Sequence, residues 1–129
     1  MTAIPTDLFF REHRGAAYNC LHFTVEAWRR LFGFDISQML LAFDSPFDGA
    51  ELRLIRPLNA DDFKKITRPR NKSLCLFRSP MRDSLHIGTF LNGKILHLDG
   101  QGVKLQPLEI MSINFKSVTF YEYLDHHKQ

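Results

Sequence analysis

Cysteine is scarce in this chain of 129 residues, which has two, Cys20 and Cys75. Two cysteines cannot build the disulfide framework that staples many small secreted domains. The first residues, MTAIPTDLFFREHR, also lack the basic and apolar regions of a secretory signal peptide. We therefore expect reduced thiols and synthesis in the cytoplasm without a signal peptide. Cys75, inside the apolar run LCLF, is predicted to be a small buried hydrophobe.

Long apolar runs and runs of basic residues are absent as well. No segment approaches the roughly 20 apolar residues that cross a membrane as a helix. The formal net charge is only +3, and the densest basic stretch, between Lys64 and Lys72, is interrupted by Pro69. We interpret that stretch as a solvated connector. The sequence therefore predicts neither a nucleic-acid partner nor a membrane partner.

The first half of the chain carries helical patterns. Asn19 is a suitable N-cap and Gly33 a suitable stop for a helix over residues 19–33. Apolar residues recur within it at helical spacing and predict one buried stripe. This stripe consists of Leu21, Val25, Trp28 and Phe32. Shorter helices are predicted over 35–43 and 59–66, on either side of a turn cluster at 44–49.

The second half reads as a series of short strands separated by turns. The predicted strands span residues 74–77, 85–91, 94–98, 102–108 and 117–123. Helices followed by a run of strands indicate the α+β class. We therefore predict a single domain over residues 1–129. Its N-terminal helix should pack on an antiparallel sheet of about five strands.

The best-defined turn is Asn92-Gly93, between two of these strands. Both central residues of a type I′ turn need positive φ, which Asn and Gly adopt readily. The turn predicts that Leu91 lies opposite Lys94. The register of the whole hairpin follows from this pair.

Counting outward from the turn places Gly88 opposite His97 and His86 opposite Asp99. Because alternate residues of a strand return to the same face, His86, His97 and Asp99 should share one face of the hairpin. Gly88 leaves room on that face beside the His97 imidazole. Two histidines and a carboxylate are thus predicted to lie side by side.

A cysteine at a helix start and a histidine on a neighbouring sheet can form a nucleophilic pair. The helix N-terminus and an imidazolium both lower a thiol pKa, and the imidazole then acts as general acid and base. We assign Cys20 as the nucleophile and His86 as its base. Either His97 or Asp99 would orient His86. The backbone N–H of Cys20 and the hydroxyl of Tyr18 are candidate oxyanion donors.

Two segments of the chain resemble the NlpC/P60 cysteine peptidases. YNCLHFTVEAWRRLFG is similar to the family's nucleophile helix, whose motif is Tyr-Asp-Cys. SLCLFRSPMRDSLHIGTFLNGKILHLDGQGVKLQPL is similar to its strands, and the versions among phage tail proteins look closest. The resemblance covers roughly residues 18–108. It implies a papain-like core, a Cys20, His86 and His97 triad, and an oxyanion-side role for Tyr18.

The chain departs from this pattern around the nucleophile. Asn19 stands where the family has Asp, and Leu21 and His22 replace the small or Trp residues that follow the cysteine. The turn between the two histidines is also one residue shorter. These departures bear on substrate preference more than on the nucleophile.

The resemblance implies a cysteine hydrolase that cleaves an amide bond through an acyl-enzyme. Many members of the family cut γ-D-glutamyl to diamino-acid bonds in peptidoglycan stem peptides. A phage or prophage tail is the implied context, with other tail proteins as partners and delivery to the periplasm as one route. We expect no cofactor. Zinc ligation by Cys20, His86 and His97 lacks a short ligand pair, so no metal is expected.

Two other functions remain open from the sequence. The chain could be a catalytically silent structural or tail-assembly protein with the same fold. It could also be a cysteine acyltransferase or deamidase that acts on a protein. All three functional hypotheses share the fold and differ in the role of Cys20.

Overall fold

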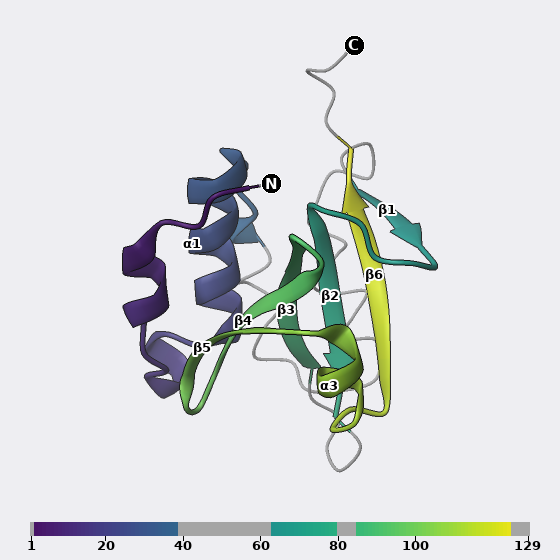
Figure 1. Cartoon of the computed structure of the whole chain (residues 1–129). Coiled ribbons are helices and arrows are strands. Elements are labelled where there is room, and N and C mark those ends of the chain that lie inside the picture. Colours follow the sequence, from purple (N-terminus) through teal and green to yellow (C-terminus); the bar gives the residue numbers. More distant parts are fainter. Residues whose placement is uncertain (1, 39–62, 80–84, 125–129) are drawn as a thin grey trace.

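The computed structural model describes residues 2–38, 63–79 and 85–124, and it belongs to the α+β class (Figure 1). One helix, α1 (Cys20–Phe32), packs on an antiparallel sheet. The sheet has six strands in the order β1-β6-β2-β3-β4-β5. The strands are β1 (Phe63–Ile66), β2 (Ser73–Arg78), β3 (Leu85–Leu91), β4 (Lys94–Asp99), β5 (Gly102–Gln106) and β6 (Ser117–Tyr123).

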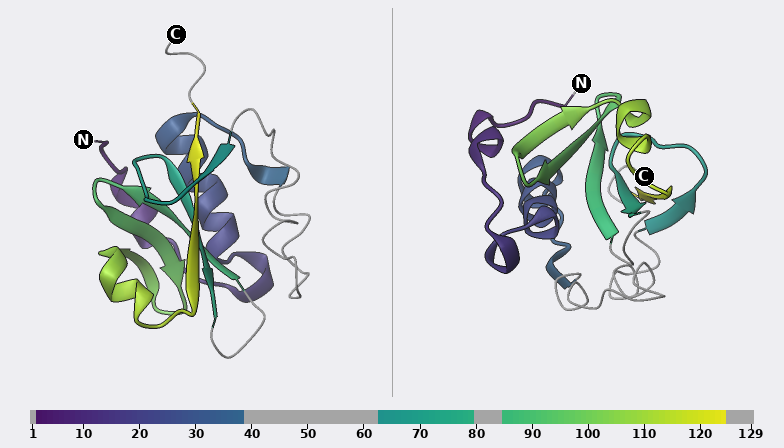
Figure 2. Two further views of the ribbon diagram at one scale, coloured as in Figure 1. Left: turned by 90° about the vertical axis from the view of Figure 1, so that its right-hand side faces the viewer. Right: turned by 90° about the horizontal axis from the view of Figure 1, so that it is seen from below.

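Three short helical segments complete the described structure. These are η1 (Thr6–Phe10), η2 (Gly15–Ala17) and α3 (Leu108–Ser112). Seen along the axis of α1, the sheet curves around that helix, and α3 lies on the other side of the sheet (Figure 2). The two faces of the sheet therefore carry different elements.

Helix α1 begins and ends at the predicted residues. The Asn19 side-chain oxygen accepts hydrogen bonds from the N–H groups of Leu21 (3.0 Å) and His22 (3.4 Å). In return, Nδ1 of His22 accepts the Asn19 N–H at 3.2 Å, so an imidazole fills the place of the usual Glu or Gln in a capping box. Gly33 ends the helix in the left-handed region at φ 70°. These bonds satisfy backbone groups that a helix end leaves unpaired.

The predicted stripe of α1 faces the sheet. Leu21, Val25 and Trp28 are buried, and Phe32 lies partly buried against the Trp28 ring at 4.8 Å between centroids. The Trp28 indole N–H donates to the Thr89 hydroxyl at 2.8 Å, which fixes α1 on β3. Because both groups are buried, this bond satisfies a polar pair that water cannot reach.

The helix predicted over 59–66 is wrong over its last four residues. Residues 63–66 form strand β1, which pairs with β6 in the register Phe63↔Tyr123 to Ile66↔Phe120. Phe63 packs on Trp28 at 5.5 Å, so pairing and packing with distant residues override the local pattern. Residues 59–62, the turn cluster at 44–49 and the second half of the helix predicted over 35–43 lie outside the described residues.

The five strands predicted from the sequence are confirmed, with small shifts at their ends. The sheet has one strand more than expected because β1 joins its edge. The strand predicted over 102–108 ends at Gln106, and Pro107 begins the short helix α3. Proline has no N–H for a ladder bond, which suits this boundary.

Each face of the sheet has its own hydrophobic cluster. On the α1 face, Ile87 of β3 and Leu96 and Leu98 of β4 pack with residues of the helix. On the opposite face, Ile95 of β4 packs with Met111 of α3. Side chains alternate between these faces along each strand. His97, between Leu96 and Leu98, therefore lies on the α3 face.

Candidate active site

The hairpin of β3 and β4 has the predicted register. Asn92 and Gly93 both adopt positive φ, 53° and 82°, and Leu91 pairs with Lys94. The pairing continues to Thr89 opposite Leu96. Among the described strands, residues 85–88 of β3 pair with β2 alone. The β3–β4 ladder therefore ends before position 88, although the backbone at position 88 still lies close to His97.

Gly88 permits β4 to approach β3 closely at this point. A Cβ atom at position 88 would lie 2.7 Å from Cγ2 of Ile95 and 3.2 Å from Cβ of His97. Real Cβ atoms do not come within 3.0 Å of such a neighbour. The predicted space beside His97 is thus present, and the glycine is required for it.

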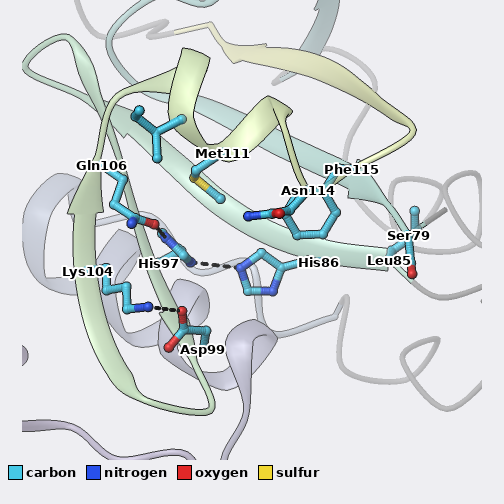
Figure 3. Close-up of a pocket in the computed structure, with 11 residues that line it drawn as sticks. Ser79, Leu85, His86, His97, Asp99, Lys104, Gln106, Met111, Asn114 and Phe115 are labelled. Atoms are coloured by element: carbon cyan, nitrogen blue, oxygen red, sulfur yellow. Dashed lines mark hydrogen bonds and ion pairs between the residues drawn. The ribbon is translucent and has the colours of Figure 1, made fainter. Parts of the chain in front are cut away.

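The two histidines form a hydrogen-bonded relay with Gln106 (Figure 3). Nε2 of His86 lies 2.8 Å from Nδ1 of His97, and Nε2 of His97 lies 2.8 Å from the side-chain oxygen of Gln106. The two rings are nearly perpendicular, at 87°. Nδ1 of His86 makes no hydrogen bond to any described residue.

Gln106 was not predicted as a site residue. It is the last residue of β5, next to the proline that begins α3. The sequence did carry a signal for this residue. Lys104 and Gln106 are polar residues at alternate positions of β5, and β5 pairs with the strand that carries His97. Sequence alone does not show that the amide reaches this imidazole.

Burial keeps both imidazoles neutral. His97 is only 3% exposed, and burial lowers its pKa below the ordinary value. Burial also lowers the pKa of His86, to about 3, and repulsion from a charged His97 adds to this effect. The ring of Phe115 stacks on His86 with 5.6 Å between centroids and 8° between planes. A neutral imidazole is the form that accepts a proton.

Asp99 lies near the relay but is not part of it. Its carboxylate pairs with the Lys104 ammonium at 2.7 Å and accepts the Gln101 N–H at 2.8 Å. Burial alone would raise the pKa of Asp99, but these two hydrogen bonds hold it below the ordinary value. Of the two candidates for orienting His86, the structure thus places His97 in contact with it.

A cavity of about 460 Å³ opens beside these residues. His86, His97 and Gln106 contribute to its polar wall, and Met111 and Phe115 contribute to its apolar wall (Figure 3). The cavity lies on the α3 face of the sheet. Cys20 is not among the residues that line it.

Cys20 reaches β3 from the α1 face. It is the first residue of α1, is 7% exposed, and packs with Ile87. Burial raises the pKa of the Cys20 thiol, whereas hydrogen bonds from the backbone N–H groups of Ile87, Leu21 and Cys20 itself act to lower it. Within the described residues, no hydrogen bond joins the Cys20 sulfur to His86. Ile87, whose backbone N–H acts on the thiol pKa, is the residue that follows His86.

The expected thiolate–imidazolium pair is not what the structure shows. Burial raises the pKa of the Cys20 thiol and lowers the pKa of the His86 imidazole. Both shifts favour the neutral forms. Both groups therefore rest in their neutral forms rather than as a preformed ion pair.

Tyr18 is not a free oxyanion donor. Its hydroxyl donates to Glu26 at 2.5 Å, and Glu26 also binds the Arg11 guanidinium at 2.7 and 2.9 Å. Burial and the Glu26 hydrogen bond raise the pKa of Tyr18. The single hydroxyl proton of Tyr18 is thus used in the hydrogen bond to Glu26. Of the two predicted oxyanion donors, the backbone N–H of Cys20 remains.

Cys75 behaves as predicted. It is fully buried on the α3 face, in the cluster that contains Ile95 and Met111. Burial raises the pKa of its thiol far above the ordinary value. A thiol of this kind is chemically inert.

The sequence matches no protein-family model and no curated protein. In residues 2–38, 63–79 and 85–124, no group of three histidine, cysteine or acidic side chains is placed to hold a metal ion. None of the helices described above has the length and apolar character needed to cross a bilayer.

Replacing Gly88 with alanine tests the close approach of the two strands. The added methyl group would displace Ile95 or His97, so Gly88→Ala should lower the free energy of unfolding by about 1–3 kcal/mol. Urea denaturation measures this change. Gly100→Ala is the matched control, because a Cβ there meets no atom within 4 Å. Equal stabilities of the two variants would contradict the packing described here.

The neutral histidines predict acid-sensitive stability. The native pKa of His86, about 3, lies below the unfolded value of about 6.5, so the unfolded chain binds more protons in this window. Stability should therefore fall as the pH falls from about 6.5 towards 3, by up to about 1.4 kcal/mol per pH unit for each such histidine. In His86→Gln, whose amide can still donate to His97, the slope should be smaller. Identical slopes in both proteins would refute the neutral site.

Proposed function

We propose that this protein is a cysteine hydrolase in which Cys20 is the nucleophile and His86 its general base. One observation carries the proposal. The backbone N–H of Ile87 acts to lower the pKa of the Cys20 thiol, and Ile87 is next to His86, whose imidazole is hydrogen-bonded to His97. A nucleophile, a base and an orienting group are thus joined through one hairpin and one helix start.

The chemistry begins with proton transfer because both partners rest in neutral forms. Nδ1 of His86 takes the thiol proton while the sulfur attacks the carbonyl carbon of an amide. The backbone N–H of Cys20, at the start of α1, can donate to the oxyanion. His86 then returns the proton to the leaving amine as the C–N bond breaks, which leaves a thioester on Cys20. Water, deprotonated by His86, hydrolyses the thioester and restores the thiol.

The thiol must approach Nδ1 of His86 for this first step. The Ile87 N–H is near enough to lower the pKa of the Cys20 thiol, and Ile87 is the residue next to His86. Hydrogen bonds between reacting groups are often long before substrate binds and tighten in the complex. Because Cys20 lies on the α1 face and His86 lines the cavity on the α3 face, a rearrangement that brings the sulfur to Nδ1 of His86 is part of the proposal.

The substrate class follows from the resemblance to the NlpC/P60 peptidases. An α1 that starts at Cys20 and packs on antiparallel strands bearing His86 and His97 is compatible with the papain-like core of that family. We propose a peptidoglycan stem peptide as substrate, cut at the γ-D-glutamyl to diamino-acid bond. A phage or prophage tail would deliver the enzyme and supply its protein partners.

A second candidate is a catalytically silent structural protein with the same fold. The observation that favours it is the burial of Cys20, whose sulfur makes no hydrogen bond to His86 in the described structure. In this case the cysteine would serve as packing between α1 and β3, and a tail-assembly role would not depend on its thiol.

Cleavage of purified muropeptides separates these functions. The wild-type protein should release the terminal diamino-acid fragment, detected by mass spectrometry, and Cys20→Ala should release none. His86→Ala should lower the rate by about 10²–10⁴-fold, the usual contribution of a general base. Cys75→Ala is the matched control and should keep the activity, because this cysteine is fully buried in the apolar cluster of Ile95 and Met111 and does not line the cavity.

Two results would contradict the hydrolase proposal. Wild-type protein without activity on muropeptides, together with a Cys20→Ala variant that retains full biological function, would favour the structural candidate. Modification of a partner protein in place of cleavage would instead show an acyltransferase or deamidase that uses the same thiol.

A further inference from the structure

We propose that Gln106 is a positioning residue of this site, one that fixes the tautomers of His97 and His86 so that Nδ1 of His86 can accept the Cys20 proton. The inference rests on the proposed function for its consequence in catalysis. Its structural part, the assignment of the His86 and His97 tautomers, depends only on the hydrogen bonds among His86, His97 and Gln106.

The position of each proton follows from what each group can donate. The Gln106 side-chain oxygen only accepts, so Nε2 of His97, 2.8 Å away, must carry its proton. A neutral His97 then has a lone pair on Nδ1. Nε2 of His86, 2.8 Å from that lone pair, must in turn carry a proton. The lone pair of a neutral His86 is therefore on Nδ1, the nitrogen without a described partner.

The relay is held in place by packing. His97 is 3% exposed, so water cannot readily replace the amide as its partner. Gln106 ends β5 with its backbone opposite Ile95, and Pro107 turns the chain at once into α3. Its side chain can thus reach His97 across one strand spacing. Figure 3 shows Gln106, His97 and His86 in this order along the wall of the cavity.

An amide at this position differs from a carboxylate in a way that matters for the base. A carboxylate beside Nε2 would stabilise the His97 imidazolium. An imidazolium donates from both nitrogens, so Nδ1 of His97 would donate to Nε2 of His86. Neutral His86 would then carry its proton on Nδ1, where it cannot accept one from the thiol. A neutral amide is thus what keeps the lone pair of His86 on Nδ1.

Other charged groups near the relay do not set these tautomers. Asp99 and Lys104 influence His97 at a distance but bind each other at 2.7 Å. His13, in the segment before α1, faces His86 only through a long-range repulsion. Among the described residues, the relay nitrogens have hydrogen bonds only to one another and to Gln106.

Ring nitrogen NMR on the full ¹⁵N-histidine-labelled chain tests the tautomers directly. In the wild-type protein at pH 7, His86 and His97 should both show a protonated Nε2 and an unprotonated Nδ1. In Gln106→Glu, His97 should become doubly protonated and the proton of His86 should move to Nδ1. Gln101→Glu, the same change on the exposed β4–β5 turn, should keep the wild-type pattern. Wild-type tautomers in Gln106→Glu, or a protonated Nδ1 on wild-type His86, would overturn the inference.

Kinetics on a cleaved substrate test the consequence. Gln106→Glu should lower kcat by about 10²-fold or more near neutral pH with little change in KM, because only the base is lost. Its activity should return at higher pH, where His97 loses the added proton. A loss that does not depend on pH, or one confined to KM, would show a structural role and overturn the inference.

The two proposals can fail separately. If the NMR pattern is as expected and no substrate is cleaved, the relay exists and the hydrolase proposal fails. If muropeptides are cleaved but Gln106→Glu keeps the wild-type tautomers and pH profile, the hydrolase stands and the role of Gln106 is refuted. A dispersed amide spectrum for each variant shows that the chain is folded in every comparison.

Discussion

The 2.8 Å hydrogen bond between His86 and His97 is the contact on which the site depends. It requires two strands that approach closely enough for their imidazoles to touch, and Gly88 permits this approach. The Asn92-Gly93 turn sets the register, so that the histidines are diagonal neighbours on one face of the hairpin. A one-residue slip would move one imidazole to the α1 face and break the relay.

Burial gives this contact its chemical character. Apolar packing by Phe115 and the strands makes a charged histidine unfavourable, and it makes a Cys20 thiolate unfavourable as well. Under the proposed function, such a site would hold no resting ion pair, and attack would require the transfer of one proton from Cys20 to His86. The backbone N–H groups of Ile87 and Leu21, which act to lower the pKa of the Cys20 thiol, would then stabilise the sulfur charge as it forms. The same burial explains why an acidic medium should weaken the fold.

The sequence predicted the features that local signals determine. Asn19 and Gly33 mark the ends of α1 through capping geometry, and Asn92-Gly93 marks the hairpin through its positive φ angles. Strand β1 was predicted to be a helix because its partner, β6, is far along the chain. The sequence also did not predict Gln106 as a site residue, and it predicted the Tyr18 hydroxyl as an oxyanion donor without showing the Glu26 hydrogen bond. Their partners, His97 and Glu26, are set by tertiary structure.

The most direct test of a shared role for Cys20 and His86 is the rate of alkylation by iodoacetamide. It is read for each cysteine by peptide mass between pH 5 and 9, in wild-type protein and in His86→Ala. We predict that Cys20 reacts much faster than Cys75 at pH 7 and that His86→Ala removes most of this advantage. The rate should rise with pH without a plateau near pH 6, because no preformed thiolate is present. An inert Cys20, or equal rates with and without His86, would contradict the account.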